Sequence, residues 1–343
     1  TLLTLTGPGE HTVTIDDIDR AIDATTVVPV VAGTLDHFDI GINNSTIPYV
    51  DDVLEPIPDL IAGGILSNVT VIARDVFGNH IASFADSISL LTSFGDEAIN
   101  PSRISMASGF NGSGDEFGVW RGSISITRAD TNISLLVEDD IYSRIGISNE
   151  FDVFAGTYAD LQLIFEGEIT TPGVAPGKIG LPLPVTAGDT ISAVVTAVDQ
   201  FWNPVLGEPW VHFASDNYFD MVSLNDTQLE ADGSSDFDIL LRTATTHSIS
   251  VNDLTFPSYS DSSSVTAGLG VWEKMVLVTP GETHEPGGYE PDGKIGTPAE
   301  QVASLQFSIT AQATDKYWNS IPIDGGIINL VASDGTLDAP NPI

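Results

Sequence analysis

The sequence reads VTVIARDVFGNHI from Val69, AVVTAVDQFWNPV from Ala193 and SITAQATDKYWNSI from Ser308. Each stretch runs into the same motif: Asp, any residue, an aromatic residue, Gly or Trp, and Asn. The motifs span Asp75 to Asn79, Asp199 to Asn203, and Asp315 to Asn319. Their spacings of 124 and 116 residues predict tandem copies of one domain, because self-similarity at a fixed period is the signature of repeat architectures.

Two further landmarks recur in the same order. An Ala-Gly pair closes a β-like run at Gly33, Gly156 and Gly268, and a new alternating run follows each one. The predicted new strands cover Phe38 to Ile42, Leu161 to Phe165, and Lys274 to Val278. A Pro/Gly-rich loop with Gly-Lys-Ile-Gly precedes the second and third motifs, as PGVAPGKIGLP from Pro172 and PGGYEPDGKIGTP from Pro286, and the first repeat lacks it.

The pattern within one repeat is that of an all-β immunoglobulin-like sandwich. Short alternating runs are separated by Gly, Pro, Asn and Asp, and no sustained helical period occurs. We expect about seven strands in about 118 residues per unit. The predicted division is 1–35 as the C-terminal part of one repeat, 36–157 and 158–270 as complete domains, and 271–343 as the N-terminal part of another repeat.

These motifs resemble those of a known class of repeat. The stretch VTVIARDVFGNHIASFADSISLLTS is similar to the bacterial immunoglobulin-like repeats of invasin- and intimin-type adhesins, where a strand ends in Asp-x-x-Gly-Asn. The Gly-Lys-Ile-Gly loop followed by Asp-x-x-Trp-Asn resembles a repeat of very large bacterial surface proteins. The resemblance implies a stalk, adhesin or fibre at the cell surface or outside the cell, and it supplies no catalytic residues.

The Asp-Asn motif has a structural explanation of its own. Asp and Asn side chains bond to nearby backbone and tolerate left-handed geometry, so the motif predicts a tight connection between two strands. We expect the aromatic residues Phe77, Phe201 and Tyr317 to plug the end of the core. Trp202 and Trp318 are expected either to cap the sandwich or to be exposed for contact.

Charge limits the partners. The 343 residues include 48 acidic and 11 basic ones, for a formal net charge of −37. Such a chain repels the phosphates of nucleic acids, and it contains no uninterrupted apolar run long enough to span a bilayer. The acidity indicates either solubility, as in a salty habitat, or binding of divalent cations.

Calcium is the candidate ion. Acidic residues cluster near predicted domain ends, and carboxylates with backbone carbonyls suit Ca²⁺. The candidate ligands at the domain junctions are Asp16, Asp17, Asp19, Glu138, Asp139, Asp140 and Asp253. Solvated acidic loops are the alternative, since no EF-hand-type loop is present.

Enzymatic function is not expected. There is no Cys, and none of the six His residues stands in a His-Glu-x-x-His or Gly-x-Ser-x-Gly context; no phosphate-binding loop occurs either. Two classes of function remain. One is a structural filament or stalk, and the other is an adhesin that recognises glycan or a protein partner through exposed loops.

The two ends of the chain complement each other. HTVTIDD at His11 matches HSISVND at His247, so residues 1–35 align with late strands, whereas residues 271–343 align with early strands. We expect the C-terminal piece of one copy to be completed by the N-terminal piece of the next, which builds an open filament. A longer continuous chain that supplies the same packing is the alternative. The predicted contacts join Leu3, Val13, Ile15 and Val30 to Leu305, Phe307, Ile309 and Leu330.

Overall fold

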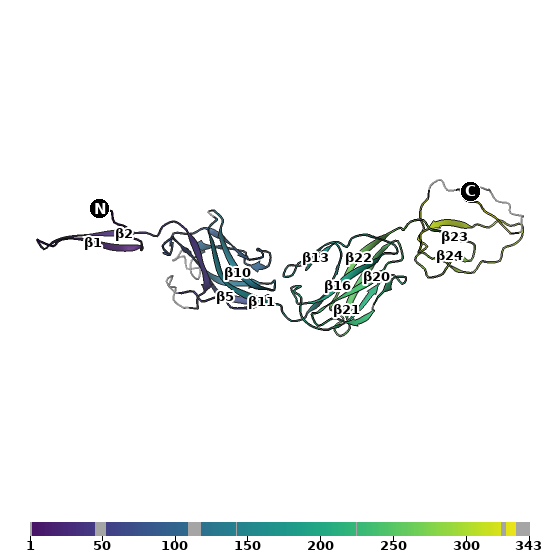
Figure 1. Ribbon diagram of the computed structural model, residues 1–343, viewed down its shortest axis with the longest axis horizontal. Helices are drawn as coiled ribbons and strands as arrows, with labels where there is room; N and C mark the ends of the chain where they lie inside the picture. The colour runs from purple at the N-terminus through teal and green to yellow at the C-terminus, as the bar shows by residue number, and fades with distance from the viewer. Residues whose placement is uncertain are drawn as a thin grey trace. The chain divides into compact units, whose positions relative to one another are not determined.

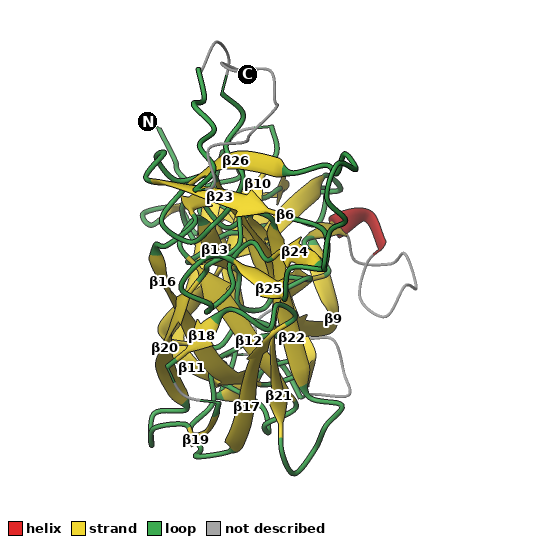
Figure 2. Cartoon of the chain, turned by 90° about the vertical axis from the view of Figure 1, so that its right-hand side faces the viewer, coloured by secondary structure: helices red, strands yellow, loops and turns green. Residues whose placement is uncertain are grey.

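The computed structural model describes residues 2–44, 53–108, 118–141, 143–223, 225–323 and 327–333. Figure 2 shows strands and loops, with one short 3₁₀ helix, η1 (Met106–Ser108). No α-helix occurs in the described part of the chain. The predicted all-β architecture of tandem immunoglobulin-like sandwiches is confirmed.

The first sandwich has two sheets that close over one core. The four-stranded sheet has the order β3-β5-β9-β7, and the five-stranded sheet has the order β4-β11-β10-β6-β8. The bounds are β3 (His37–Ile42), β4 (Leu60–Ile61), β5 (Ile65–Arg74), β6 (Ser87–Thr92), β7 (Ile99–Asn100), β8 (Arg103–Ser105), β9 (Val119–Ile126), β10 (Asp130–Asp139) and β11 (Ile145–Phe154). Alternating residues of each strand point inward, so Val69, Val71, Ile88, Leu90 and Leu135 are fully buried.

The second sandwich repeats this plan. Its sheets have the orders β12-β16-β20-β18 and β15-β22-β21-β17-β19. The bounds are β12 (Asp160–Phe165), β15 (Val185–Thr186), β16 (Thr190–Val198), β17 (Trp210–Ser215), β18 (Met221–Val222), β19 (Asp226–Gln228), β20 (Ser234–Leu240), β21 (Thr246–Asp253) and β22 (Ser260–Gly268). Phe213 of one sheet stacks on Phe237 of the other at 4.5 Å between ring centroids, which ties the two layers together.

The remaining strands form small two-stranded sheets. The hairpin β1 (Gly9–Asp17) and β2 (Ile22–Val30) stands near the N-terminus (Figure 1). The other pairs are β13 (Glu168–Thr170) with β14 (Lys178–Gly180), β23 (Lys274–Val278) with β26 (Thr310–Thr314), and β24 (Glu282–His284) with β25 (Lys294–Gly296).

The chain folds into two compact units. One consists of Thr1–Ala159, Thr171–Lys178 and Val198–Val205, and the other of Asp160–Thr170, Ile179–Ala197 and Leu206–Ile343. The second Asp-Asn motif therefore belongs to the unit of the first sandwich. The third motif belongs to the unit of the second sandwich. The domain boundaries at 36–157 and 158–270 stay a prediction.

The strand predictions were largely right, with one difference. The three strands expected after the Ala-Gly landmarks are confirmed as β3, β12 and β23, and the run expected to close at Gly268 does so, since β22 ends there. Each sandwich has nine strands within its described residues instead of seven, because short edge strands such as β4 and β7 extend the sheets.

Candidate functional site

The Asp-Asn motif is a turn organised by the carboxylate of its Asp. In the third motif, Asp315 Oδ1 accepts the backbone N–H groups of Tyr317 and Asn319, both at 2.9 Å. Its Oδ2 accepts the N–H of Gly270 at 3.1 Å. The same bond joins Asp75 to Gly33 at 2.8 Å and Asp199 to Gly156 at 2.7 Å. The Asp thus fastens its turn to the glycine that ends the preceding strand run.

These bonds stabilise the ionised Asp. Burial by itself opposes ionisation of Asp75, but hydrogen bonds from the Asn79 side chain and from the N–H groups of Gly33, Asn79 and Phe77 outweigh it. The pKa of Asp75 is therefore lowered to about 2. The turn is held by a charged acceptor over the whole neutral and mildly acidic range.

The Asn side chain of each motif bonds to a second backbone segment. Asn319 Nδ2 donates to the carbonyl oxygen of Arg242 at 2.9 Å, and Asn319 Oδ1 accepts the N–H of Ala244 at 2.8 Å. Asn203 makes the matching bonds with Thr127 O and Ala129 N, both at 2.8 Å. Both Asn residues are buried: Asn203 is 0% exposed and Asn319 is 2% exposed. The Asn side-chain amide thus donates one hydrogen bond to the backbone segment and accepts one from it, as a neighbouring strand would.

We call each motif with its contacted segment a joint. The first joint is 75–79 with 6–8, the second is 199–203 with 127–129, and the third is 315–319 with 242–244. In the first joint, Asn79 Nδ2 donates to Thr6 O at 2.7 Å. Pro8 stands where the other joints have Ala129 and Ala244. Because Pro has no N–H, the first joint lacks the second bond.

The aromatic residue of the motif packs differently in the three joints. In the second joint, Phe201 packs against the core of the first sandwich, as expected, and its ring lies over Gly63, where an added Cβ would be 2.1 Å from the ring. In the third joint, Tyr317 lies over Gly188, where the distance would be 2.3 Å. Phe77 has no glycine partner among the described residues and is 64% exposed, so it does not plug a core.

The fourth residue of the motif is left-handed in every joint. Gly78 has φ +80°, Trp202 +60° and Trp318 +67°. A left-handed backbone suits Gly and costs other residues roughly 1 kcal/mol. Trp318 is nevertheless 8% exposed, so it caps the turn, as one of the two sequence-based expectations had it.

A glycine loop covers each Trp. An added Cβ on Gly177 would lie 2.1 Å from the Trp202 ring, and one on Gly293 would lie 2.3 Å from the Trp318 ring. Both glycines belong to the Gly-Lys-Ile-Gly loops. Burial of a Trp contributes several kcal/mol, which exceeds the left-handed strain. The first repeat has neither the loop nor the Trp.

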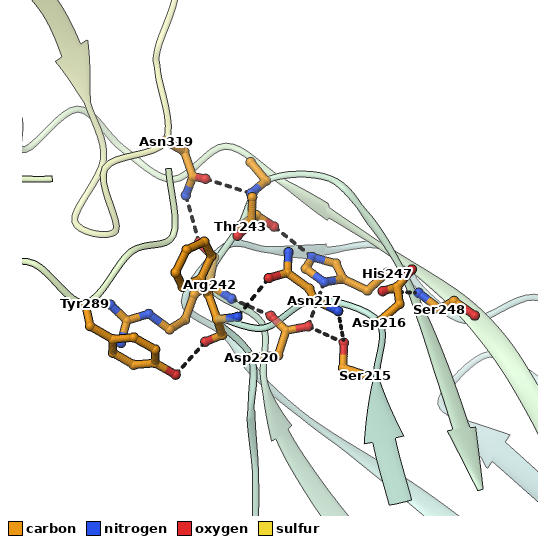
Figure 3. A network of polar contacts seen from close by, with 12 residues as sticks. Ser215, Asp216, Asn217, Asp220, Arg242, Thr243, His247, Ser248, Tyr289 and Asn319 are labelled. Atoms are coloured by element: carbon orange, nitrogen blue, oxygen red, sulfur yellow. Dashed lines mark hydrogen bonds and ion pairs between the residues drawn. The ribbon is translucent and has the colours of Figure 1, made fainter. Parts of the chain in front are cut away.

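Arg242 joins the third joint to its neighbouring loop (Figure 3). Its Nε donates to Gly287 O at 2.9 Å, and its terminal nitrogen donates to Gly288 O at 2.7 Å. Its guanidinium lies 4.1 Å from the Tyr289 ring centre and 5.1 Å from that of Tyr317. The Arg thus binds both the loop backbone and the motif aromatic residue.

A buried ion pair of His247 and Asp220 contacts the segment 242–244 of the third joint. His247 Nδ1 is 2.7 Å from Asp220 Oδ2, both side chains are fully buried, and His247 Nε2 is 2.8 Å from Thr243 O. Both ring nitrogens lie near oxygen acceptors, which favours the doubly protonated ring. Burial alone would lower the pKa of His247, but the bonds to Asp220 and Thr243 raise it above 6.5.

A histidine recurs at the same repeat position in the first hairpin. His11 matches His247, and its Nε2 lies 2.7 Å from Gly7 O. Recurrence of His at one repeat position is a sequence signal for a structural role of this side chain.

The acidic residues predicted for calcium have other contacts. Asp17, Asp139 and Asp253 hold equivalent hairpin turns, where their carboxylates accept the N–H groups of residues two or three positions ahead. Asp140 forms an ion pair with Arg103 and accepts the Ser89 hydroxyl at 3.1 Å. Asp16 and Asp19 are exposed, and Glu138 is half-buried. Among the described residues, no three His, Asp or Glu side chains gather as a metal site, and the calcium site stays a prediction.

Within the described residues, no helix has the length and apolar character needed to cross a membrane.

The residues predicted to join copies differ in exposure. Leu3, Ile15, Leu305 and Phe307 are exposed, while Val13, Val30, Ile309 and Leu330 are half-buried.

The chain is distantly similar to several solved structures. No family model and no curated protein matches the chain. The D0–D1 domains of intimin are 12% identical with a TM-score of 0.25, over 62% of this chain and 94% of that one. Invasin, a bacterial integrin-binding protein, is 15% identical with a TM-score of 0.28, over 79% and 47%.

An enzyme is also among the similar structures. A glycosyl hydrolase family 2 member from Bacteroides cellulosilyticus is 10% identical with a TM-score of 0.27, over 67% of this chain and 28% of that one. The chain thus spans less than half of the invasin and hydrolase structures. Adhesin and enzyme both appear at low similarity, so function has to be argued from the residues of this chain.

Proposed function

We propose that the chain is a non-enzymatic structural repeat segment of an extracellular or cell-surface protein, and that copies associate head to tail by completing one another's sandwich. One observation carries the proposal. The β1–β2 hairpin is built like a hairpin that belongs to a sandwich, yet its matching positions are half-buried or exposed in the part of the chain that the structure describes.

The β1–β2 hairpin matches the β21–β22 hairpin in register. His11 pairs with Val28 in the first hairpin, as His247 pairs with Val265 in the second. The histidines also make the same bond to a carbonyl four residues earlier. The alignment of residues 1–35 with late strands of a repeat therefore rests on geometry as well as on sequence.

The matched positions differ in burial. Ile249 and Val251 of β21 are fully buried, between the two sheets of the second sandwich. Their counterparts in β1 are Val13, which is half-buried, and Ile15, which is 72% exposed. A strand that presents core residues to solvent is a template for another chain.

The segment that precedes β26 carries the complementary surface. Ile309 corresponds to Ala193, which is 1% exposed in the second sandwich, and Phe307 is 53% exposed. Leu305 is 66% exposed. We propose that Leu3, Val13, Ile15 and Val30 of one copy pack on Leu305, Phe307, Ile309 and Leu330 of the next.

The free energy gained by burying these eight side chains is sufficient for association. Full burial of an aliphatic or aromatic side chain contributes about 1.5–3 kcal/mol, so eight contribute at most roughly 12–24 kcal/mol. Association costs about 4–15 kcal/mol in lost rigid-body freedom. The surplus is enough for a specific contact, and because the contact is head-to-tail it propagates into an open filament.

The test is sedimentation of the full chain over a range of protein concentrations, with electron microscopy of the same samples. We expect concentration-dependent end-to-end oligomers. Ile15→Asp should abolish them, whereas Leu206→Asp, at a side chain that is 82% exposed outside the interface, should leave them intact. A chain that stays monomeric at every concentration, or an Ile15→Asp variant that assembles normally, contradicts the proposal. Packing supplied only within a longer chain would give the first of these results.

Adhesion is the second candidate. Trp210, Tyr218 and Trp272 are exposed at 51%, 86% and 56%, and exposed aromatic side chains are common in sites for glycans and proteins. Binding of the monomeric Ile15→Asp variant to a glycan array, with loss on Trp210→Ala and Tyr218→Ala, would favour this function. It does not require self-association.

A further inference from the structure

We propose that the Ser304 turn of one copy docks between the Phe77 ring and the Leu5 carbonyl of another copy and so completes the first joint. This inference rests on the proposed head-to-tail association and specifies the residues that make it.

The second and third joints show what a complete joint contains. Besides the Asp-Asn motif and its contacted segment, each has a turn on which the aromatic ring sits. In that turn, Gly63 N–H donates to Ile126 O at 2.8 Å, and Gly188 N–H donates to Leu241 O at 2.7 Å. Each acceptor directly precedes the residue that the Asn amide contacts. Ring, turn and carbonyl therefore form one unit.

Residues 302–305 form the same turn. A backbone bond closes each turn, from Gly64 N to Ile61 O at 2.8 Å, Asp189 N to Thr186 O at 2.9 Å, and Leu305 N to Val302 O at 3.1 Å. The third residue of each turn has positive φ: Gly63 at +76°, Gly188 at +100° and Ser304 at +71°. Ser304 lies eleven residues before Asp315, as Gly188 lies eleven before Asp199.

A left-handed Ser is strained, and this one is exposed. The chain retains the special turn at Ser304 although this residue is exposed among the residues that the structure describes. The strained backbone and the sequence position are two independent signs that residues 302–305 are built to receive an aromatic side chain.

The first joint has the ring and the contacted segment but lacks this turn. Asp75 is bonded to Gly33, and Asn79 is bonded to Thr6 O, so the motif and the contacted segment are already assembled. Leu5 directly precedes Thr6, as Leu241 precedes Arg242 and Ile126 precedes Thr127. The Phe77 ring, at 64% exposure, stands where Phe201 and Tyr317 meet their glycine turns.

The occupant is therefore another copy of this chain. Within the described residues, Phe77 has no glycine turn against its ring and the Ser304 turn is exposed, and the two complete joints indicate that ring and turn fit each other. The parts also come from the two surfaces that the proposed function brings together, since Leu5 flanks Leu3 and Ser304 flanks Leu305.

The joint between copies is built more weakly than the other two. At Gly63 and Gly188 an added Cβ would lie 2.1 and 2.3 Å from the ring, so the Cβ of Ser304 forces the Phe77 ring to shift outward. Pro8 removes one hydrogen bond, and Gly78 replaces the capping Trp. The contact between copies is the one at which an assembly separates first.

The absence of Cys from the sequence allows a direct proximity test in the full chain. Phe77→Cys and Ser304→Cys chains are mixed and oxidised. We expect a disulfide-linked heterodimer that forms at least about tenfold faster than with Leu206→Cys in place of Phe77→Cys. Equal rates for the two mixtures would overturn the inference.

A gain-of-function variant gives a second readout. Ser304→Gly removes the Cβ and the backbone strain, so it should strengthen association by about tenfold, whereas Phe77→Ala should weaken it by about tenfold or more. Both variants should keep the wild-type melting temperature as monomers, since both side chains are exposed.

The two levels of proposal fail separately. If wild-type chains associate but neither Ser304→Gly nor Phe77→Ala changes the association constant, the Phe77–Ser304 contact is wrong and head-to-tail assembly stands. If wild-type chains do not associate at any concentration, the proposed function fails and this inference fails with it.

Discussion

The third joint makes a quantitative prediction about Asn319. Substitution Asn319→Ala leaves the Arg242 carbonyl and the Ala244 N–H without their partners at 2.9 and 2.8 Å. Asp315 loses one donor but keeps the N–H groups of Gly270 and Tyr317. A buried polar group left unpaired costs about 1–3 kcal/mol. Two such groups, in a segment that is half-buried, give an expected loss of about 2–4 kcal/mol.

Hydrogen exchange is the appropriate assay, because a chain with two compact units need not unfold in one step. Exchange of the Ala244 amide in the native state should become faster by roughly 30- to 1000-fold, which corresponds to about 2–4 kcal/mol. Amides in the core of the first sandwich, such as that of Val71, should exchange at the wild-type rate.

The first joint supplies the matched control. Asn79→Ala removes bonds to the exposed Thr6 carbonyl and to Asp75, but it leaves no N–H unpaired, because Pro8 offers none. Water replaces the bond to Thr6, and Asp75 keeps the backbone N–H groups of Gly33, Phe77 and Asn79, so the expected loss is about 1 kcal/mol or less. Equal losses for Asn79→Ala and Asn319→Ala would refute the argument, as would a loss below about 1 kcal/mol for Asn319→Ala.

Three further predictions concern other parts of the molecule. The pKa of His247 is raised in the fold, so its pairing with Asp220, near the charge of Asp216, stabilises the protein fully below about pH 6.5 and loses this effect as the pH rises through the raised pKa. Thermal melts should show stability falling over that range, and His247→Gln should flatten the curve. Trp318→Gly relieves left-handed strain but empties the space over Gly293, so calorimetry should show a net loss of about 2–4 kcal/mol. Association of copies should strengthen between low and high salt, because each copy carries a net charge of −37 and salt screens their repulsion; sedimentation at two ionic strengths checks this, and weaker association at high salt would contradict the hydrophobic interface.

The sequence predicted the strands well because their signal is local. Alternation of apolar and polar residues, broken by Gly and Pro, is read within one strand, and β3, β12 and β23 fell where expected. The Asp-Asn motif was also correctly read as a turn, since Asp315 bonds to residues two and four positions ahead. What the sequence pattern did not show is the second set of contacts. Asn203 bonds to Thr127 across 76 residues, and no local pattern encodes that distance.

The glycine that bonds to the motif carboxylate could not be predicted from the Ala-Gly landmark. In the first two repeats this glycine belongs to the Ala-Gly pair, as Gly33 and Gly156. In the third repeat the strand ends at Gly268 as expected, but the N–H that donates to Asp315 Oδ2, at 3.1 Å, belongs to Gly270. The landmark marks the end of a strand run, whereas the bond depends on which N–H faces the carboxylate.

The motif Trp and the Gly-Lys-Ile-Gly loop form one structural element. In the sequence they occur together or not at all. Gly78 lacks a loop, while Trp202 and Trp318 each follow a Gly-Lys-Ile-Gly segment. A left-handed Trp is unfavourable on an open turn, and a glycine loop with positive φ is unfavourable without a ring to cover. Together they compensate, because the missing Cβ of Gly293 is what lets the Trp318 ring approach the backbone. The first joint has neither partner, and by the same reasoning it is the one that can open without leaving a strained Trp exposed to water.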